Sequence, residues 1–424
     1  MNNLKTAGKP VEIRMDLPMT SSDGGLLLLE KADRRLSLTS RLAACLTDSR
    51  RNPRHTNSKM LTQRIFGICQ GWDDCNDFDT LRQDPLFELA LGSAPAPQPT
   101  LCRFENERDH RQLYAMSLAM VELFIDRHRA CPPRRIVIDM DATDDPAHGQ
   151  QQFEFFHAYY GRHCFLPLLV FCSVDSGDEE LVGAILRPGN AHAGRRSAGI
   201  LRRLARMLQT AFPNTDLMFR ADAGFALPEV YETCERLGVS YLISLARNER
   251  LQEMAAPLMD ESRAIHAQGG QKSRHFGEIS YAAKTWTHER RVIVKAEVMR
   301  QGENPRFVVT NLLGDPEALY DEYCKRGDCE NRIKELKLDL FSGRTSCHKF
   351  SANAFRLLLS AAAFVLLCEV RRMLSGTGLA RAAMGQIRLK LLKIAAQVQF
   401  STRRVLVRMP RGHPHAELLA ALMS

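Results

Sequence analysis

The chain has 424 residues, of which 45% are hydrophobic and 25% are charged, as is ordinary for a soluble globular protein. Its longest apolar run, residues 357–368, is shorter than the roughly 20 residues that a membrane span requires. This excludes a membrane protein and predicts a buried helix. A net charge of +9 favours a polyanionic partner, and nucleic acid is the first candidate.

The twelve cysteines include no C-x-x-C pair, and the nearest approach, Cys324 with Cys329, leaves four residues between. Residues 1–12 are polar and lack the apolar core of a signal peptide. We therefore expect reduced thiols in a cytoplasmic protein, and nothing in the pattern supports a zinc site.

Composition and periodicity divide the chain into five regions. Residues 1–130 are expected to be mainly helical. Residues 131–249 alternate strands with helices, which predicts an α/β core. Residues 250–312 carry β-rich patterns, residues 313–370 are helical, and residues 371–424 form a basic helical region.

In the α/β region we expect five strands and two helices. The strands are Arg135–Asp141, Phe165–Phe171, Leu181–Leu186, Asp216–Asp222 and Ser240–Leu245, and the helices are Arg195–Phe212, which is basic and amphipathic, and Pro228–Leu237. Antiparallel strands are expected at Gly277–Ala282, Arg290–Val298 and Arg306–Asn311. Near the C-terminus a helix over Arg388–Gln399 would suit DNA contact or protein packing.

Three carboxylates lie at well-defined positions. Asp141 and Asp222 each end a predicted strand, and Glu330 lies on a later helix. Sites in open α/β sheets form at the carboxyl ends of strands, and oxygen ligands there hold hard divalent cations. Two such ions assist in-line displacement at a phosphodiester. The alternative is that each aspartate is only a turn residue or a helix cap.

A polar stripe surrounds Glu330. Tyr323, Arg326 and Lys337 share its side of a predicted helix. The alternative is a solvated helix face with i,i+4 pairs such as Glu330 with Lys334.

The spacing Y-x2-R-x3-E-x6-K of this stripe reproduces the Y-R-E-K signature of DDE transposases from bacterial insertion sequences. Residues 138–149 and 219–225 resemble the blocks around the first and second aspartates of that family. Residues 100–106 and 186–190 resemble one subgroup, which includes elements that mobilise β-lactamase genes. The resemblance extends over most of the chain.

The resemblance implies a ribonuclease-H-like core interrupted by a β-rich insertion, with helical N- and C-terminal regions. It implies Mg²⁺ or Mn²⁺, two ions per site, and a dimer that holds double-stranded DNA, both the terminal inverted repeats and the target. The activity implied is cut-and-paste transposition in the bacterial cytoplasm. Metal ligation falls to Asp141, Asp222 and Glu330, and DNA contact to Tyr323, Arg326, Lys334 and Lys337.

Some assignments stay open. Asp139 shares a strand face with Asp141, and Asp144 and Asp145 follow closely, so each is an alternative first ligand. Trp286 lies in the insertion, where an aromatic side chain could hold a flipped base or simply pack the sheet.

A basic cluster near the N-terminus could recognise the terminal repeats or form an ordinary charged surface; Arg50, Arg51 and Arg54 are its leading DNA-binding candidates, beside Arg34, Arg35, Arg41, Lys59 and Arg64. Rival functions are a metal-dependent nuclease or resolvase, and a non-catalytic DNA-binding regulator. A glycosidase would also use paired carboxylates but would not explain the basic flanks.

Overall fold

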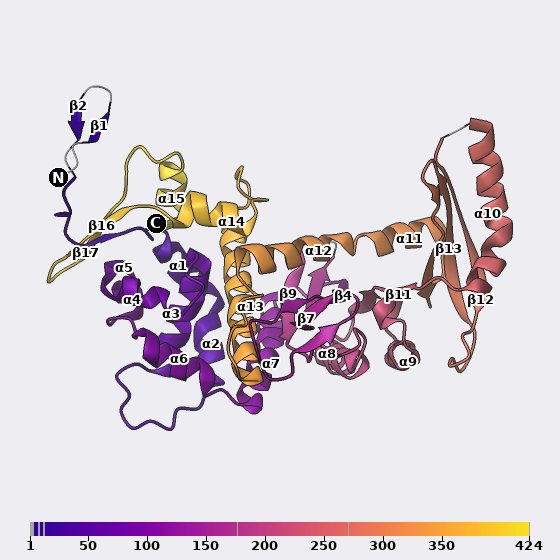
Figure 1. The fold of residues 1–424 in the computed structure, drawn as a ribbon, viewed down its shortest axis with the longest axis horizontal. Helices are drawn as coiled ribbons and strands as arrows, with labels where there is room; N and C mark the ends of the chain where they lie inside the picture. The colour runs from indigo at the N-terminus through magenta and orange to yellow at the C-terminus, as the bar shows by residue number, and fades with distance from the viewer. Residues whose placement is uncertain (1–3, 7–8, 12, 176, 270, 424) are drawn as a thin grey trace.

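The computed structural model describes residues 4–6, 9–11, 13–175, 177–269 and 271–423. At its centre is a nine-stranded mixed sheet in the order β12-β13-β15-β11-β10-β4-β8-β9, with β14 paired to β13 (Figure 1). The strands β4, β10 and β11 are parallel; β8 runs antiparallel to β4, and β9, which is antiparallel to β8, runs in the same direction as β4. The predicted α/β class is confirmed. These strands are β4 (Arg135–Ala142), β8 (Leu168–Val174), β9 (Glu180–Ile185), β10 (Asp216–Ala221) and β11 (Ser240–Leu245).

One predicted strand is divided. Residues 165–171 split into the end of β7 (Arg162–Phe165) and the start of β8, because Pro167 has no N–H to donate to a ladder. The strand β7 instead pairs with β5 (Asp145–Pro146) and β6 (Phe155–His157) in a small separate sheet.

Helices cover both faces of the central sheet (Figure 1). Alternate residues of β4, such as Ile138 and Met140, pack toward α7 (His110–His128), α8 (Ser197–Ala211) and α9 (Pro228–Leu237). The residues between them face α11 (Pro316–Cys324) and α12 (Gly327–Lys334), with Val137 packed near Tyr320. The period-two alternation therefore places the aspartates of β4 beneath α11 and α12.

The insertion extends the central sheet. Its strands are β12 (Ser273–Tyr281), β13 (Arg290–Met299), β14 (Gly302–Glu303) and β15 (Arg306–Thr310), and β15 pairs with β11. The three predicted antiparallel strands are confirmed. A helix that we did not predict, α10 (Glu249–Gly269), packs on them and buries Leu251, Ala255 and Met259, which recur every four residues.

The helix α13 (Phe350–Met373) lies between the N-terminal helices and the central sheet, in contact with α1, α3 and α6 and also with β9 and α7 (Figure 1). That helix is long and apolar enough to cross a membrane, but 83% of its most apolar window is buried inside the protein, so it is a core helix. The buried helix predicted over residues 357–368 is confirmed. The elements of the N-terminal region are α1 (Leu26–Leu36), α2 (Leu38–Ala44), α3 (Asn57–Gln70), α4 (Asp77–Thr80), η1 (Leu81–Gln83), α5 (Pro85–Leu91) and α6 (Gln98–Asn106), preceded by β1 (Leu4–Thr6) and β2 (Lys9–Val11).

The C-terminal region is not wholly helical, and the helix predicted over residues 388–399 is wrong beyond Leu392. After α14 (Met384–Ile387) and the π-turn η4 (Arg388–Leu392), the chain forms β16 (Ala396–Phe400) and β17 (Val405–Arg408), which pair with each other. The strand β16 also pairs with β3 (Thr20–Ser21), and α15 (Ala416–Met423) ends the described chain. The reason is alternation: Ala396 and Val398 are buried while the glutamines between and after them face outward.

Candidate active site

Strand register brings two of the predicted carboxylates to the same edge. In the parallel pair of β4 and β10, Met140 lies opposite Ala221. Asp141 and Asp222, the next residues in each strand direction, therefore follow at the same level at the carboxyl ends of neighbouring strands. Asp222 also caps the short turn η2 (Ala223–Phe225), with its Oδ1 accepting from the Gly224 N–H at 2.8 Å.

Asp139 is engaged elsewhere. It lies opposite Arg220 in the register, and it is 1% exposed. The Arg220 guanidinium donates to both of its carboxylate oxygens, at 2.9 and 2.7 Å. This buried bidentate pair engages both carboxylate oxygens of Asp139. The geometry thus favours Asp141 over Asp139 as the first carboxylate of the site.

Arg326 joins the first and third carboxylates. Its Nη1 donates to Asp141 Oδ2 at 3.0 Å, and its Nη2 donates to Glu330 Oε1 at 3.2 Å. The expected i,i+4 relation of Arg326 to Glu330 is present. The single helix expected through this stripe is not, because α11 ends at Cys324 and α12 begins at Gly327. Lys334 is exposed on α12, and Glu330 is paired with the arginine instead.

Lys337 reaches the same strand end from a later turn. It lies in the π-turn η3 (Glu335–Asp339), a form common at functional sites. Its Nζ donates to Asp144 Oδ1 at 2.7 Å, to the Asp144 carbonyl at 2.9 Å and to Thr143 Oγ1 at 3.2 Å. Asp145 points away into the protein, where its Oδ2 accepts from Thr345 Oγ1 at 2.7 Å. Burial raises the pKa of Asp145 to about 7.

The carboxylates influence one another. Burial raises the pKa of Asp141 to about 6; the nearby Asp222 charge adds to this effect, and Arg326 opposes it. Carboxylate oxygens are the ligands that Mg²⁺ and Mn²⁺ prefer, so the donor set fits such ions in kind. In the described part of the chain no three ligating side chains stand close enough to enclose an ion. Arg326 contacts both Asp141 and Glu330, so an ion that binds both carboxylates would have to displace the Arg326 guanidinium from at least one of them.

The two predicted aromatic contacts differ in their surroundings. Tyr323 is half-buried at the end of α11, with its ring centroid 6.0 Å from that of Tyr320. Trp286 lies between β12 and β13, half-buried, with its ring 5.0 Å from Tyr231 and 5.5 Å from Tyr281. The Arg290 guanidinium lies 5.3 Å from the same indole ring. These contacts correspond to the packing alternative that the sequence left open for Trp286.

The basic cluster near the N-terminus does not form one surface. Arg51 and Arg54 are exposed. Arg50 is exposed but donates to both carboxylate oxygens of Asp48, at 2.8 and 2.7 Å. Arg64 is 1% exposed and forms a buried ion pair with Glu105 at 2.7 Å, so its charge is part of the core and not of the surface.

Part of the C-terminal positive charge is likewise internal. Arg371 pairs with Glu335 at 3.1 Å. The guanidinium of Arg388 donates to the backbone carbonyls of Ile68, Cys69 and Asp339. These arginines hold the N-terminal helices, α13 and the π-turns together.

Comparison with protein-family models matches residues 4–424 to the family described as Transposase DDE domain group 1. The chain belongs to this transposase family. None of the curated proteins compared with the chain matches it. Membership makes the protein a catalytic transposase that acts on DNA, and enzymes of this class use divalent metals.

Two contacts of this transposase site were not predicted from the sequence. Arg220 precedes Asp222 by two residues and shares its strand, so a basic partner for Asp139 was available in the pattern. Thr143 and Asp144 hold Lys337, a contact that joins residues 193 and 194 positions apart and carries no local signal.

Proposed function

We propose that this transposase cuts DNA at the terminal inverted repeats of an insertion sequence and joins the freed ends to a target by cut-and-paste transposition. We place it in the Y-R-E-K branch, with a ribonuclease-H-like core. The observation that carries the proposal is the bridge from Arg326 to Asp141 and Glu330, which brings the end of a core strand and a much later helix to one point.

The chemistry has two displacements at phosphorus. Water attacks the phosphodiester at the element end, the P–O bond to the leaving strand breaks, and a 3′-hydroxyl is released. That hydroxyl then attacks a second phosphodiester and displaces another 3′-oxygen. Two Mg²⁺ or Mn²⁺ ions held by Asp141, Asp222 and Glu330 would supply Lewis-acid stabilisation of these oxygens.

The surrounding residues position the DNA. Arg326 suits a bidentate contact with a phosphate, and Lys337 and Lys334 supply point charges. Tyr323 contributes a phenol at the same edge. We assign further contacts to Arg50, Arg51 and Arg54 at the N-terminal region and, for an unstacked base, to Trp286; the active form would be a homodimer that pairs two DNA ends.

The test is Mg²⁺-dependent cleavage of a duplex that carries the element's own terminal repeat. We expect Glu330→Gln and Asp222→Asn to lower the cleavage rate by at least about a thousandfold, since each removes a charge that holds metal, while DNA binding persists. Asp328→Asn is the matched control, because Asp328 is an exposed acid on the same helix, whereas the ion pairs of Arg326 are with Asp141 and Glu330.

The outcomes separate the rival functions. Cleavage that persists in the two variants would contradict the carboxylate assignment. Cleavage by the wild type without joining to a second duplex would favour a nuclease or resolvase. Tight binding with no cleavage under any condition would favour a regulator.

A further inference from the structure

A row of arginines runs along α8 on a part of the chain that has no acidic residue. No Asp or Glu occurs between Glu180 and Asp216. The arginines are all exposed, and none forms an ion pair within the described ranges of the chain; they are Arg195, Arg196, Arg202, Arg203 and Arg206. An ordinary solvated helix face mixes both signs of charge, and this one does not.

The row begins beside the candidate active site. Gly194, the residue before Arg195, packs against the loop that follows Asp222, so closely that a Cβ on it would lie 2.6 Å from the Gly224 carbonyl oxygen. The Gly224 N–H in turn donates to Asp222. From this point α8 leads away from the site along the face of the sheet opposite α11 and α12 (Figure 1).

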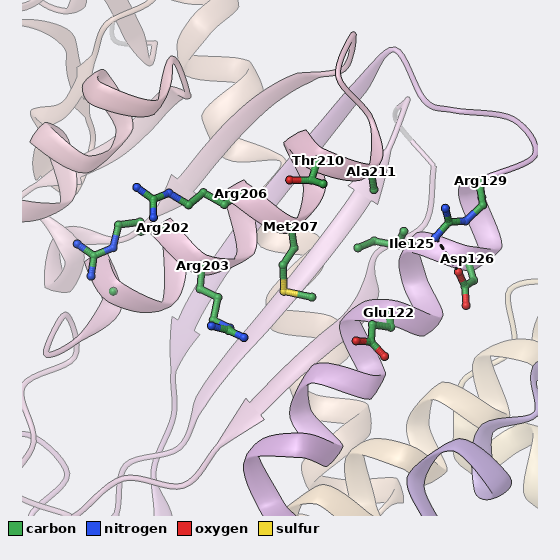
Figure 2. Close-up of a pocket in the computed structure, with 11 residues that line it drawn as sticks. Glu122, Ile125, Asp126, Arg129, Arg202, Arg203, Arg206, Met207, Thr210 and Ala211 are labelled. Atoms are coloured by element: carbon green, nitrogen blue, oxygen red, sulfur yellow. Dashed lines mark hydrogen bonds and ion pairs between the residues drawn. The ribbon is translucent and has the colours of Figure 1, made fainter. Parts of the chain in front are cut away.

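The far half of the row borders a cleft. A cavity of about 830 Å³ lies between α8 and α7, and Arg202, Arg203 and Arg206 line it (Figure 2). The α7 side contributes two acids, Glu122 and Asp126, and Asp126 is paired with Arg41 at 2.6 Å and with Arg129 at 3.1 Å. The lining as a whole has four arginines against these two acids, so the cleft carries a net positive charge.

We propose that α8 is a track for the phosphates of duplex DNA that enters or leaves the active site. The inference rests on the proposed function and adds a DNA contact surface to it. Guanidinium groups suit phosphate oxygens. Arg195 and Arg196 lie in the turn before α8, and from its first residue, Ser197, to Arg206 the helix rises roughly 14 Å at 1.5 Å per residue, which corresponds to about four base pairs at 3.4 Å each.

The experiment is a salt titration of DNA affinity without divalent metal, so that its result does not depend on cleavage. The variant is Arg202→Gln with Arg206→Gln. Arg203 is left in place because its guanidinium lies 5.3 Å from the Tyr114 ring and contributes to packing. The control, Arg134→Gln with Arg300→Gln, removes two exposed charges elsewhere: Arg134 precedes the far end of β4, and Arg300 follows β13.

Each phosphate contact contributes roughly 0.9 to the slope of log K against log salt. We therefore expect the track variant to lose about two units of slope, with an affinity loss of at least about tenfold at 0.1 M salt, and the control to stay near the wild type. Equal slopes and affinities in the wild type and the track variant would overturn the proposal, as would an equal loss in both variants.

Two duplexes identify the DNA on the track. A loss confined to the terminal-repeat duplex assigns α8 to the element end, and an equal loss on an unrelated duplex assigns it to target or flanking DNA. Trimming the repeat duplex by about four base pairs on either side of the cleaved bond should abolish the difference between variant and wild type on one side only.

Discussion

Glu179 is a carboxylic acid that the fold buries. It lies just before β9 and is 7% exposed, and among the residues that the structure describes neither of its carboxylate oxygens has a hydrogen-bond partner. Burial, reinforced by the Asp139 charge and opposed by Arg220, raises its pKa to about 8. We predict that Glu179→Gln stabilises the protein, and does so more as the pH rises.

The sign follows from proton linkage. Between the ordinary pKa of 4.5 and the folded value of about 8, the folded state keeps a proton that the unfolded state releases. Stability is therefore lost as the pH rises through this window. Each unit of difference is worth about 1.36 kcal/mol, so the cost reaches about 4–5 kcal/mol above pH 8, of which about 3 kcal/mol develops between pH 5.5 and 9.

Urea denaturation at pH 5.5 and pH 9 measures this directly, with the variant and the wild type compared at a shared m value. The exposed Glu253→Gln on α10 controls for the change of charge. A stability difference between Glu179→Gln and the wild type that does not change with pH would refute the reasoning, and so would a variant less stable than the wild type at pH 9.

Three further predictions concern the site and its support. Asp139→Asn should cost about 3 kcal/mol of stability, because it removes the carboxylate that pairs with the buried Arg220 at 2.7 Å and leaves the longer ion pair with Glu322, at 3.7 Å; a variant that unfolds in urea like the wild type would contradict this. Arg326→Gln should tighten Mn²⁺ binding in calorimetric titration while it slows DNA cleavage, because the guanidinium competes for two carboxylates; unchanged Mn²⁺ affinity would contradict that competition. Trp286→Ala should lower stability by about 2–3 kcal/mol and Trp286→Phe by less, measured by urea denaturation, and equal stability of all three proteins would exclude the packing role.

Periodicity predicted much of the architecture because the elements bury regular patterns. The strand ending in Asp141 and the three strands of the insertion were found where alternating or continuous apolar residues required them. The helix α10 lies outside the prediction, although Leu251 and Ala255 recur at helical spacing, because the β-branched residues of the strands that follow dominate the pattern of residues 250–312. The strand β16 was read as a helix because its short alternation is masked by neighbouring apolar residues.

The site was less accessible to sequence reasoning than the fold. Local spacing gave the pair of Arg326 and Glu330, which lie four residues apart. It could not choose between Asp139 and Asp141, because both occupy one strand face and the choice depends on Arg220, which pairs with Asp139 from the neighbouring strand. Contacts between distant segments depend on strand register and side-chain packing, and neither can be read from the residue pattern of a single strand.

The pairing of β15 with β11 has a mechanical consequence. A continuous ladder of backbone hydrogen bonds runs from β4 through β10 and β11 into the insertion, so no flexible joint separates the insertion strands from the strands that carry the aspartates. The two parts then form a rigid frame, and DNA that touches both must adapt its own curvature to the spacing between them. Bending a duplex site of roughly 20–30 base pairs costs about 1–6 kcal/mol. Sequences that bend easily would therefore be preferred as substrates.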